Sequence, residues 1–264
     1  MIETKGQEYE YRGLMARLWD AFRGDTTHWP DQVLFQKMAR ERGGALLDVG
    51  CGTGRLLLDL LSHGVDADGV DNSPEMLALC REKAAARGLS PALYEQSMER
   101  LDLPRRYRTI LVPSSSFQLL TDPNGAAEAM RRFRAHLEPG GMLALPFMEF
   151  WRDGEPLSTD WSGPREASLP DGTLARRWTR AEFDPGTQCE SSEDRWEVVQ
   201  GDVTIAAEHH RRSPATRWYS HAEAVRLLRD AGFTEIRLLH EFEETPASPD
   251  DRGFTALALR RIPG

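Results

Sequence analysis

The segment ALLDVGCGTGRLLLDLL, residues 45–61, constrains the fold more than any other part of the chain. A short apolar run that carries one acid, Asp48, is followed by three alternating glycines and then by an amphipathic stretch, Arg55–Ser62. This order predicts a strand, a tight turn and a helix, the opening unit of a nucleotide-binding α/β sheet. The glycines permit positive φ and let backbone amides approach a ligand, and the helix start leaves further amides unpaired beside them.

The spacing of the glycines distinguishes between ligands. A dinucleotide fingerprint that starts at Gly50 requires glycine at position 55, where this chain has Arg55. The pattern is instead acid-x-Gly-x-Gly-x-Gly, and with it the chain resembles the class I S-adenosylmethionine-dependent methyltransferases, small-molecule type. In that family the loop holds the amino-acid end of the cofactor; a glycine-rich turn without a ligand is the alternative. The resemblance implies cofactor contacts at Asp48, Gly50, Cys51, Gly52 and Gly54.

A second acid supports the same cofactor. The next predicted strand, residues 66–70, ends at Asp71, 21 positions beyond Gly50 and close to the roughly 20 expected for a ribose-binding acid. A carboxylate there accepts hydrogen bonds from both ribose hydroxyls. A helix follows, with Ser73 as its N-cap, and the resemblance implies that Asn72 and Met76 lie beside the adenine.

The third predicted strand, residues 92–96, leads to Ser97, Met98 and Glu99. The family often has an acid after this strand that meets the adenine amino group, and an apolar residue against the ring. Here Ser97 stands at the position of the acid, with Met98 as the apolar partner. The Ser97 hydroxyl or the Met98 backbone amide replaces the contact, or Glu99 makes it from a shifted register.

The loop after the fourth predicted strand, residues 109–113, bears on the substrate, because ligands of such sheets sit at the carboxyl ends of the strands. Enzymes that methylate nucleic-acid bases carry Asn/Asp-Pro-Pro-aromatic here, whereas this chain has PSSSFQ, which argues against base methylation. Serines that cap backbone groups are the alternative to serines that bind a ligand. We expect Pro113 and Ser114 at the cofactor, and Ser115, Phe117 and Gln118 at a small polar substrate.

Residues 1–44 predict two helices, because their apolar residues recur at spacings of three and four. In relatives that the chain resembles, such a prelude covers the cofactor as a lid. Tyr9 and Tyr11 are then candidates to reach the methionine carboxylate or the substrate, with Tyr11 preferred. Packing between helix and sheet is the alternative for either ring.

Residues 126–136 predict a helix, residues 138–141 a sharp turn and residues 142–147 a fifth strand, and here the cofactor-binding core, residues 45–147, ends. Residues 148–216 then break the α/β rhythm with three or so predicted antiparallel strands, which would form a substrate wall or a dimer contact. Residues 217–264 return to the α/β domain with two more strands, the last antiparallel. Trp151 and Trp178 are candidates for the substrate pocket, although aromatic residues also favour strands for packing alone.

The chain offers few candidates for a general base. His209 and His210 are adjacent, so on a strand only one of them can face a pocket; we name His210 and Tyr219 as catalytic candidates. A solvated strand end is the alternative for the histidines. No metal site is expected, since ligands at metal spacing are missing.

Composition argues against several classes of protein. The net charge of −9, with 42 acidic and 33 basic residues, gives no footprint for nucleic acid. Three scattered cysteines make no disulfide framework, which favours a reduced cytoplasmic setting. No run is long enough to span a membrane, and the first residues do not resemble a signal peptide.

We therefore expect a Rossmann-like seven-stranded methyltransferase sheet with helices on both faces and a small antiparallel β insertion after the fifth strand. The expected reaction is direct SN2 transfer of a methyl group from S-adenosylmethionine to nitrogen or oxygen of a small molecule, by a monomer or homodimer. A protein or RNA methyltransferase is one alternative. A module that binds the cofactor without catalysis is the other.

Overall fold

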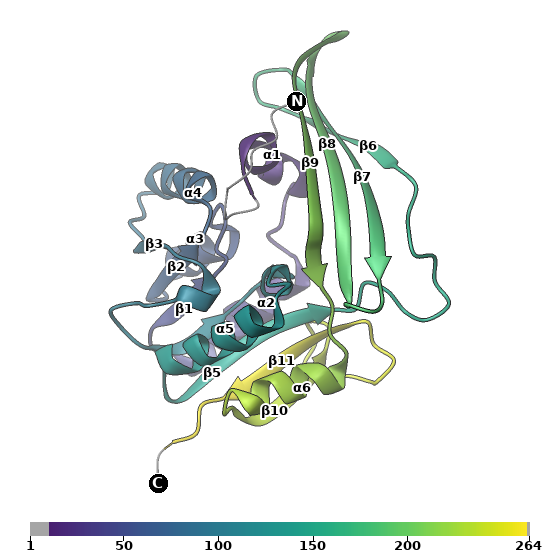
Figure 1. Cartoon of the computed structure of the whole chain (residues 1–264). Coiled ribbons are helices and arrows are strands. Elements are labelled where there is room, and N and C mark those ends of the chain that lie inside the picture. The colour runs from purple at the N-terminus through teal and green to yellow at the C-terminus, as the bar shows by residue number, and fades with distance from the viewer. Residues whose placement is uncertain (1–10, 263–264) are drawn as a thin grey trace.

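The computed structural model describes residues 11–262, which form two β-sheets and the helices around them (Figure 1). The core sheet has seven strands in the order β10-β11-β5-β4-β1-β2-β3. All neighbouring strands are parallel except β11, which runs antiparallel to both β10 and β5. The fold class and the antiparallel last strand are thus confirmed. The core strands are β1 (Leu46–Val49), β2 (Ala67–Asp71), β3 (Leu93–Glu95), β4 (Tyr107–Leu111), β5 (Leu137–Met148), β10 (Thr234–His240) and β11 (Gly253–Leu259).

Helices cover both faces of this sheet because its strands alternate their apolar side chains between two cores. Leu47 and Val49 of β1 belong to one core, and Leu46 belongs to the other. The first core lies under α5, α6 and the short η1, and the second lies under α2, α3 and α4. The helical elements are α1 (Gly13–Arg23), α2 (Pro30–Arg42), α3 (Arg55–Ser62), α4 (Pro74–Ala86), η1 (Met98–Arg100), η2 (Ser116–Leu119), α5 (Pro123–His136) and α6 (His221–Asp230).

The second sheet is the insertion, and it has four antiparallel strands in the order β6-β7-β8-β9 rather than about three. The additional strand is β6, whose sequence SGPREAS lacks apolar alternation and is mostly exposed. Its partner β7 supplies the pairing that the sequence pattern does not reveal. The strands are β6 (Ser162–Ser168), β7 (Leu174–Asp184), β8 (Cys189–Gln200) and β9 (Val203–Arg217).

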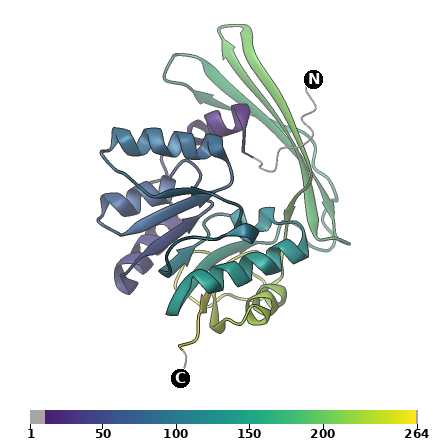
Figure 2. The ribbon, with the colours of Figure 1, turned by 60° about the vertical axis from the view of Figure 1, so that its left-hand side comes forward.

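Helix α1 joins the two sheets. It lies between α4 and the second sheet, on the side where that sheet leans over the core (Figures 1 and 2). Its apolar residues Leu14, Met15 and Leu18 form a third core with Trp196 and Val198 of β8. The N-terminal segment is therefore packed against the insertion, although the two are far apart in sequence.

One local prediction is wrong. Residues 138–141, expected as a sharp turn, continue β5. Gly140 takes a positive φ of 72°, and its amide donates to the Arg260 carbonyl at 2.8 Å, while the Arg260 amide donates to the Gly141 carbonyl at 2.9 Å. The glycines thus carry an irregularity within a paired strand, because the chain after β11 lies beside them.

Candidate active site

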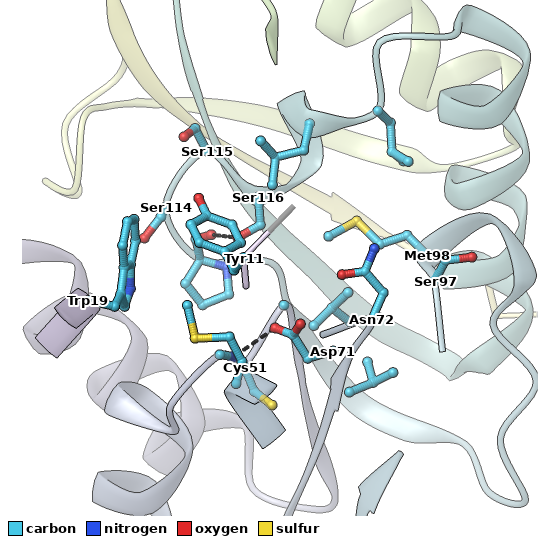
Figure 3. A pocket seen from close by; sticks show the side chains of 18 of the residues that line it. Tyr11, Trp19, Cys51, Asp71, Asn72, Ser97, Met98, Ser114, Ser115 and Ser116 are labelled. Carbon is cyan, nitrogen blue, oxygen red and sulfur yellow. Dashed lines mark hydrogen bonds between the residues drawn. The ribbon is translucent and has the colours of Figure 1, made fainter. Parts of the chain in front are cut away.

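A cavity of about 550 Å³ opens at the carboxyl ends of β1, β2 and β4, and α1 and β9 supply its remaining walls. Figure 3 shows side chains of the glycine loop, of the β4 loop and of α1 pointing toward one another. The structure brings most of the predicted site residues together here. Those that line the cavity are Tyr11, Asp48, Gly50, Cys51, Gly52, Asp71, Asn72, Met76, Ser97, Met98, Glu99, Pro113, Ser114, Ser115 and His210.

Two glycines of the loop, Gly52 and Gly54, have different structural roles. Gly52 has a φ of 54°, and a Cβ placed on it would meet nothing within 4 Å, so its backbone faces the cavity directly. Gly54 does not line the cavity. A Cβ there would lie 2.6 Å from the Cys80 Sγ and 2.8 Å from the Leu58 Cγ, so this glycine is needed for packing of α3 against α4 and not for a ligand. The structure thus removes Gly54 from the predicted cofactor contacts.

The carboxylate of Asp71 is held at the end of β2 by two backbone amides. Its Oδ2 accepts from the Gly52 amide at 2.8 Å, and its Oδ1 accepts from the Ser73 amide at 2.8 Å. Burial raises the pKa of this carboxyl despite these bonds. Since a carboxylate offers about four acceptor positions, Asp71 can accept ribose hydroxyls while it keeps the glycine loop in place.

Asp48 is buried under the same loop. Its Oδ1 has no hydrogen-bond partner among residues 11–262, and desolvation raises its pKa to about 7 even though Arg55 opposes the shift. An unpartnered buried acceptor at a cavity wall suits a cationic donor. The ammonium of a methionine moiety is such a donor, so this side chain fits the amino-acid end of S-adenosylmethionine.

Three residues after the third strand, Ser97, Met98 and Glu99, are alternatives for the contact to the adenine amino group. Ser97, Met98 and Glu99 all line the cavity. The Oε2 of Glu99 is buried and has no hydrogen-bond partner within the described residues. An unpartnered carboxylate oxygen favours Glu99, from a shifted register, as the acceptor for the adenine amino group.

Helix α1, which belongs to the expected N-terminal lid, supplies a cavity wall with two residues that are not among the predicted site residues. Trp19 and Arg23, one helical turn apart, both line the cavity, and the Arg23 guanidinium lies 4.6 Å from the Trp19 ring centroid. Burial lowers the pKa of Arg23 and raises that of Tyr11 to about 12. The Arg23 Nη2 donates to the Ser114 Oγ at 3.5 Å, and Ser114 has a positive φ of 58°. In the sequence, the spacing of four residues between Trp19 and Arg23 indicates that the two side chains share one face of the helix.

The second sheet adds the last wall, and His210 lies on it. The histidine side chain is 8% exposed and lines the cavity, whereas the neighbouring His209 is 45% exposed and faces outward. The His210 Nε2 lies 2.9 Å from the Glu208 Oε2. Arg211, Arg212, Pro214 and Ala215 line the same wall.

Two predicted residues of the β4 loop region and one catalytic candidate belong to the protein core instead. Phe117 is fully buried, with its ring centroid 5.8 Å from that of Phe147. Tyr219 packs against both rings, at 5.9 and 5.5 Å, and burial raises its pKa to about 12. Within residues 11–262, the Gln118 side chain hydrogen-bonds only backbone groups. None of these three side chains lines the cavity. The short helix η2 turns Phe117 and Gln118 toward the sheet. Tyr219 follows β9, where the chain has already returned to the core.

The two tryptophan candidates also lie off the cavity. Trp151 packs 6.3 Å from the Trp218 ring centroid, and its indole N–H donates to the Glu155 carbonyl. Trp178 lies in β7, opposite Arg195 of β8. Tyr9 is outside the described residues. No group of three or more His, Cys, Asp or Glu within residues 11–262 is arranged to hold a metal ion, and no helix of that range is long and apolar enough to cross a bilayer.

Comparison with known proteins agrees with this geometry. Residues 46–141 match a family model described as a methyltransferase domain. The chain is 36% identical over 119 residues to a phosphatidylethanolamine N-methyltransferase of Cereibacter sphaeroides, which covers 44% of this chain and 56% of that protein. It is 29% identical over 147 residues to a dTDP-3-amino-3,6-dideoxy-alpha-D-glucopyranose N,N-dimethyltransferase of Streptomyces fradiae. This match covers 54% of this chain and 56% of that protein. The chain thus spans just over half the length of each of these relatives.

A solved structure extends the likeness of fold to the whole chain. The sugar N-methyltransferase KedS8 from Streptoalloteichus sp. superimposes with a TM-score of 0.72 at 22% identity, over 99% of this chain and 98% of that one. The strand order, the glycine loop with its two acids and the matched domain agree with one another. Residues 46–141 thus carry a methyltransferase domain, the chain as a whole has the fold of solved S-adenosylmethionine-dependent methyltransferases, and the residues that line the cavity fit S-adenosylmethionine as the cofactor.

Proposed function

We propose that this protein transfers a methyl group from S-adenosylmethionine to an amine nitrogen of a small molecule. The observation that carries the proposal is the composition of the single cavity described above. One half is made by the glycine loop, Asp71 and Asp48, and the other half by α1 and β9, which include His210. Cofactor and acceptor can therefore lie end to end in one cavity.

The chemistry sets what the residues must do. When bound, the cofactor supplies a sulfonium methyl: the acceptor nitrogen forms the N–C bond, the S–C bond breaks with its electrons on sulfur, and the proton of the nitrogen passes to a base. The chain holds the two molecules in line and excludes water, an effect worth about 7–11 kcal/mol in favourable cases. His210 lies on the acceptor side and is the residue we assign to accept the proton.

The proposal has three kinds of support: two favour an amine over a hydroxyl or a macromolecule, and one concerns the cofactor. The relatives named above carry the words N-methyltransferase and N,N-dimethyltransferase for their own substrates. The aromatic ring of Tyr11, at the cavity wall, suits the sulfonium of the cofactor. A net charge of −9 disfavours RNA as the acceptor.

The test is methyl transfer from labelled cofactor to a panel of small amines, amino sugars and their nucleotide-linked forms, phenols, a basic peptide and an RNA, with products scored by mass. We expect transfer to at least one amine and none to the peptide or RNA. Transfer confined to phenols, peptide or RNA would contradict the proposal. The Asp71→Ala variant should lose turnover with every acceptor, which controls for contaminating activity.

A further inference from the structure

Glu208 of β9 lies behind the cavity wall and joins two parts of the site. Its Oε2 accepts from the backbone amide of Leu14, in the first turn of α1, at 2.8 Å. The same Oε2 lies 2.9 Å from the His210 Nε2. Glu208 itself does not line the cavity, so we assign it an effect on the site through these two neighbours.

The carboxylate fixes which imidazole nitrogen carries the proton. An ionised carboxylate can only accept, so His210 must present Nε2–H to Glu208 when its ring is neutral. The hydrogen bonds of the described residues leave Nδ1 of His210 without a partner. Nδ1 then carries the free lone pair that a base needs.

We propose that Glu208 is a positioning residue, which holds His210 in the Nε2–H tautomer and makes this state depend on the docking of α1. The inference rests on the proposed function, since it specifies how His210 accepts the proton of the acceptor amine. The proton of that nitrogen goes to Nδ1 as the N–C bond forms, and the imidazolium so produced is stabilised by the Glu208 carboxylate.

The dependence on α1 comes from how closely the helix start approaches the carboxylate. Gly13 has a φ of 55°, and a Cβ placed on it would lie 2.4 Å from the Glu208 Oε2. The Gly13 amide donates to Glu75 of α4, so this turn is held from both sides. A carboxylate at a helix N-terminus is favoured by the helix dipole, and α1 thus holds Glu208 in the place where it meets His210.

Other charged groups surround this pair. Arg212 follows on the same face of β9, and Asp194 of β8 lies opposite His210 in the strand register. Asp194 is itself bonded by Arg177 of β7, at 2.8 and 2.6 Å. Glu208 is nevertheless the carboxylate that hydrogen-bonds the His210 ring, so it is the residue to substitute.

The chain provides a matched control on the opposite face of the same sheet. There the His209 Nε2 lies 2.9 Å from the Glu193 Oε2, in a pair of the same composition and length that faces away from the cavity. Glu193→Gln therefore makes the same chemical change in the same sheet at a residue that does not line the cavity, although Glu193 also pairs with Arg180 at 2.6 Å and with Arg211 at 3.7 Å.

The first measurement needs no acceptor: nitrogen NMR of the imidazoles, with His210→Gln to assign the signals. We expect the Nε2–H tautomer in the parent protein and in Glu193→Gln. In Glu208→Gln the side-chain carbonyl oxygen can accept from the Leu14 amide and leave the amide N–H to face the ring, and this arrangement should shift His210 toward Nδ1–H. Gly13→Ala, which displaces the carboxylate from the helix side, should do the same. An unchanged His210 tautomer in both variants would overturn the inference, whether or not an acceptor is known.

The second measurement is kinetic and uses an amine that the panel identifies. Glu208→Gln should lower kcat by roughly 100-fold, the lower end of what a general base contributes, with KM for the cofactor and binding of S-adenosylhomocysteine unchanged. In the His210→Gln background the same change should have no further effect on kcat. Equal kcat values for Glu208→Gln and Glu193→Gln would overturn the inference and leave methyl transfer intact. Absence of transfer by the parent protein would instead count against the proposed function, while the NMR result still decides the role of Glu208.

Discussion

The side-chain amide of Gln118 donates a hydrogen bond to the backbone carbonyl of Arg217 at 2.9 Å. It also donates to the Met148 carbonyl at 2.8 Å, and its Oε1 accepts from the Met148 amide at 2.8 Å. Met148 ends β5 and Arg217 ends β9, so one fully buried side chain ties together the two points where the chain leaves the core and returns to it.

Replacement of Gln118 by leucine should destabilise the protein. The change keeps a similar volume and removes three part-buried hydrogen bonds to backbone groups, so we expect the free energy of unfolding to fall by about 2–4 kcal/mol. Urea denaturation measures this directly. A raised KM for the acceptor with unaltered unfolding would instead restore the substrate role that the sequence predicted for Gln118.

The ion pair between Arg55 and Asp31 should be needed for stability. The Arg55 Nη1 lies 3.1 Å from the Asp31 Oδ1, and the two side chains are only 9% and 6% exposed. Arg55→Met leaves a buried carboxylate without its cation, which typically costs about 3–5 kcal/mol. Thermal and chemical denaturation should show this loss. Arg55→Met combined with Asp31→Leu should recover most of it, and a double variant no better than the single one would contradict the assignment.

Asp48 should make stability fall as the pH rises. Its carboxyl has a pKa of about 7 in the folded protein against 3.8 for an ordinary aspartate, so the folded state binds the proton more tightly than the unfolded state does. Stability contributed by the protonated form is complete below about pH 4 and is lost as the pH rises toward about 7. Asp48→Asn should flatten this part of the pH dependence of Tm in the protein without ligand. Parallel Tm–pH curves for both proteins would show that Asp48 does not titrate in this way.

The parts of the site that follow directly from the sequence are those that a local pattern encodes. Asp48, Gly52 and Asp71 lie within or beside one strand–turn–helix unit and the strand that follows, and parallel strands bring their carboxyl ends to one edge of a sheet. Their arrangement could therefore be predicted. His210 also lines the cavity, since alternation on a strand requires that only one of two neighbours faces it.

The parts that were missed depend on contacts across the chain. Trp19 and Arg23 reach the cavity only because α1 packs against Trp196 of a strand far away in sequence. Tyr219 lies in the core because the chain re-enters the α/β domain there; the sequence predicts the re-entry but not that the Tyr219 ring packs between Phe117 and Phe147. The role of Glu208 depends on its hydrogen bond from the first turn of α1, which is far away in sequence. Such pairings are set by tertiary packing, which periodicity and motif spacing do not encode.

The measurement that tests the central claim most directly is calorimetric titration of S-adenosylhomocysteine into the parent protein, Asp71→Ala and Asp66→Ala. Asp66 is a mostly exposed carboxylate that directly precedes β2, at the end opposite Asp71, and it serves as the matched control. We predict one saturable site in the parent protein and in Asp66→Ala, with affinity lower by about 10- to 100-fold or more in Asp71→Ala, because hydrogen bonds to a charged group are worth about 1.5–3 kcal/mol. No binding heat in the parent protein, or equal affinity in Asp71→Ala, would contradict the account.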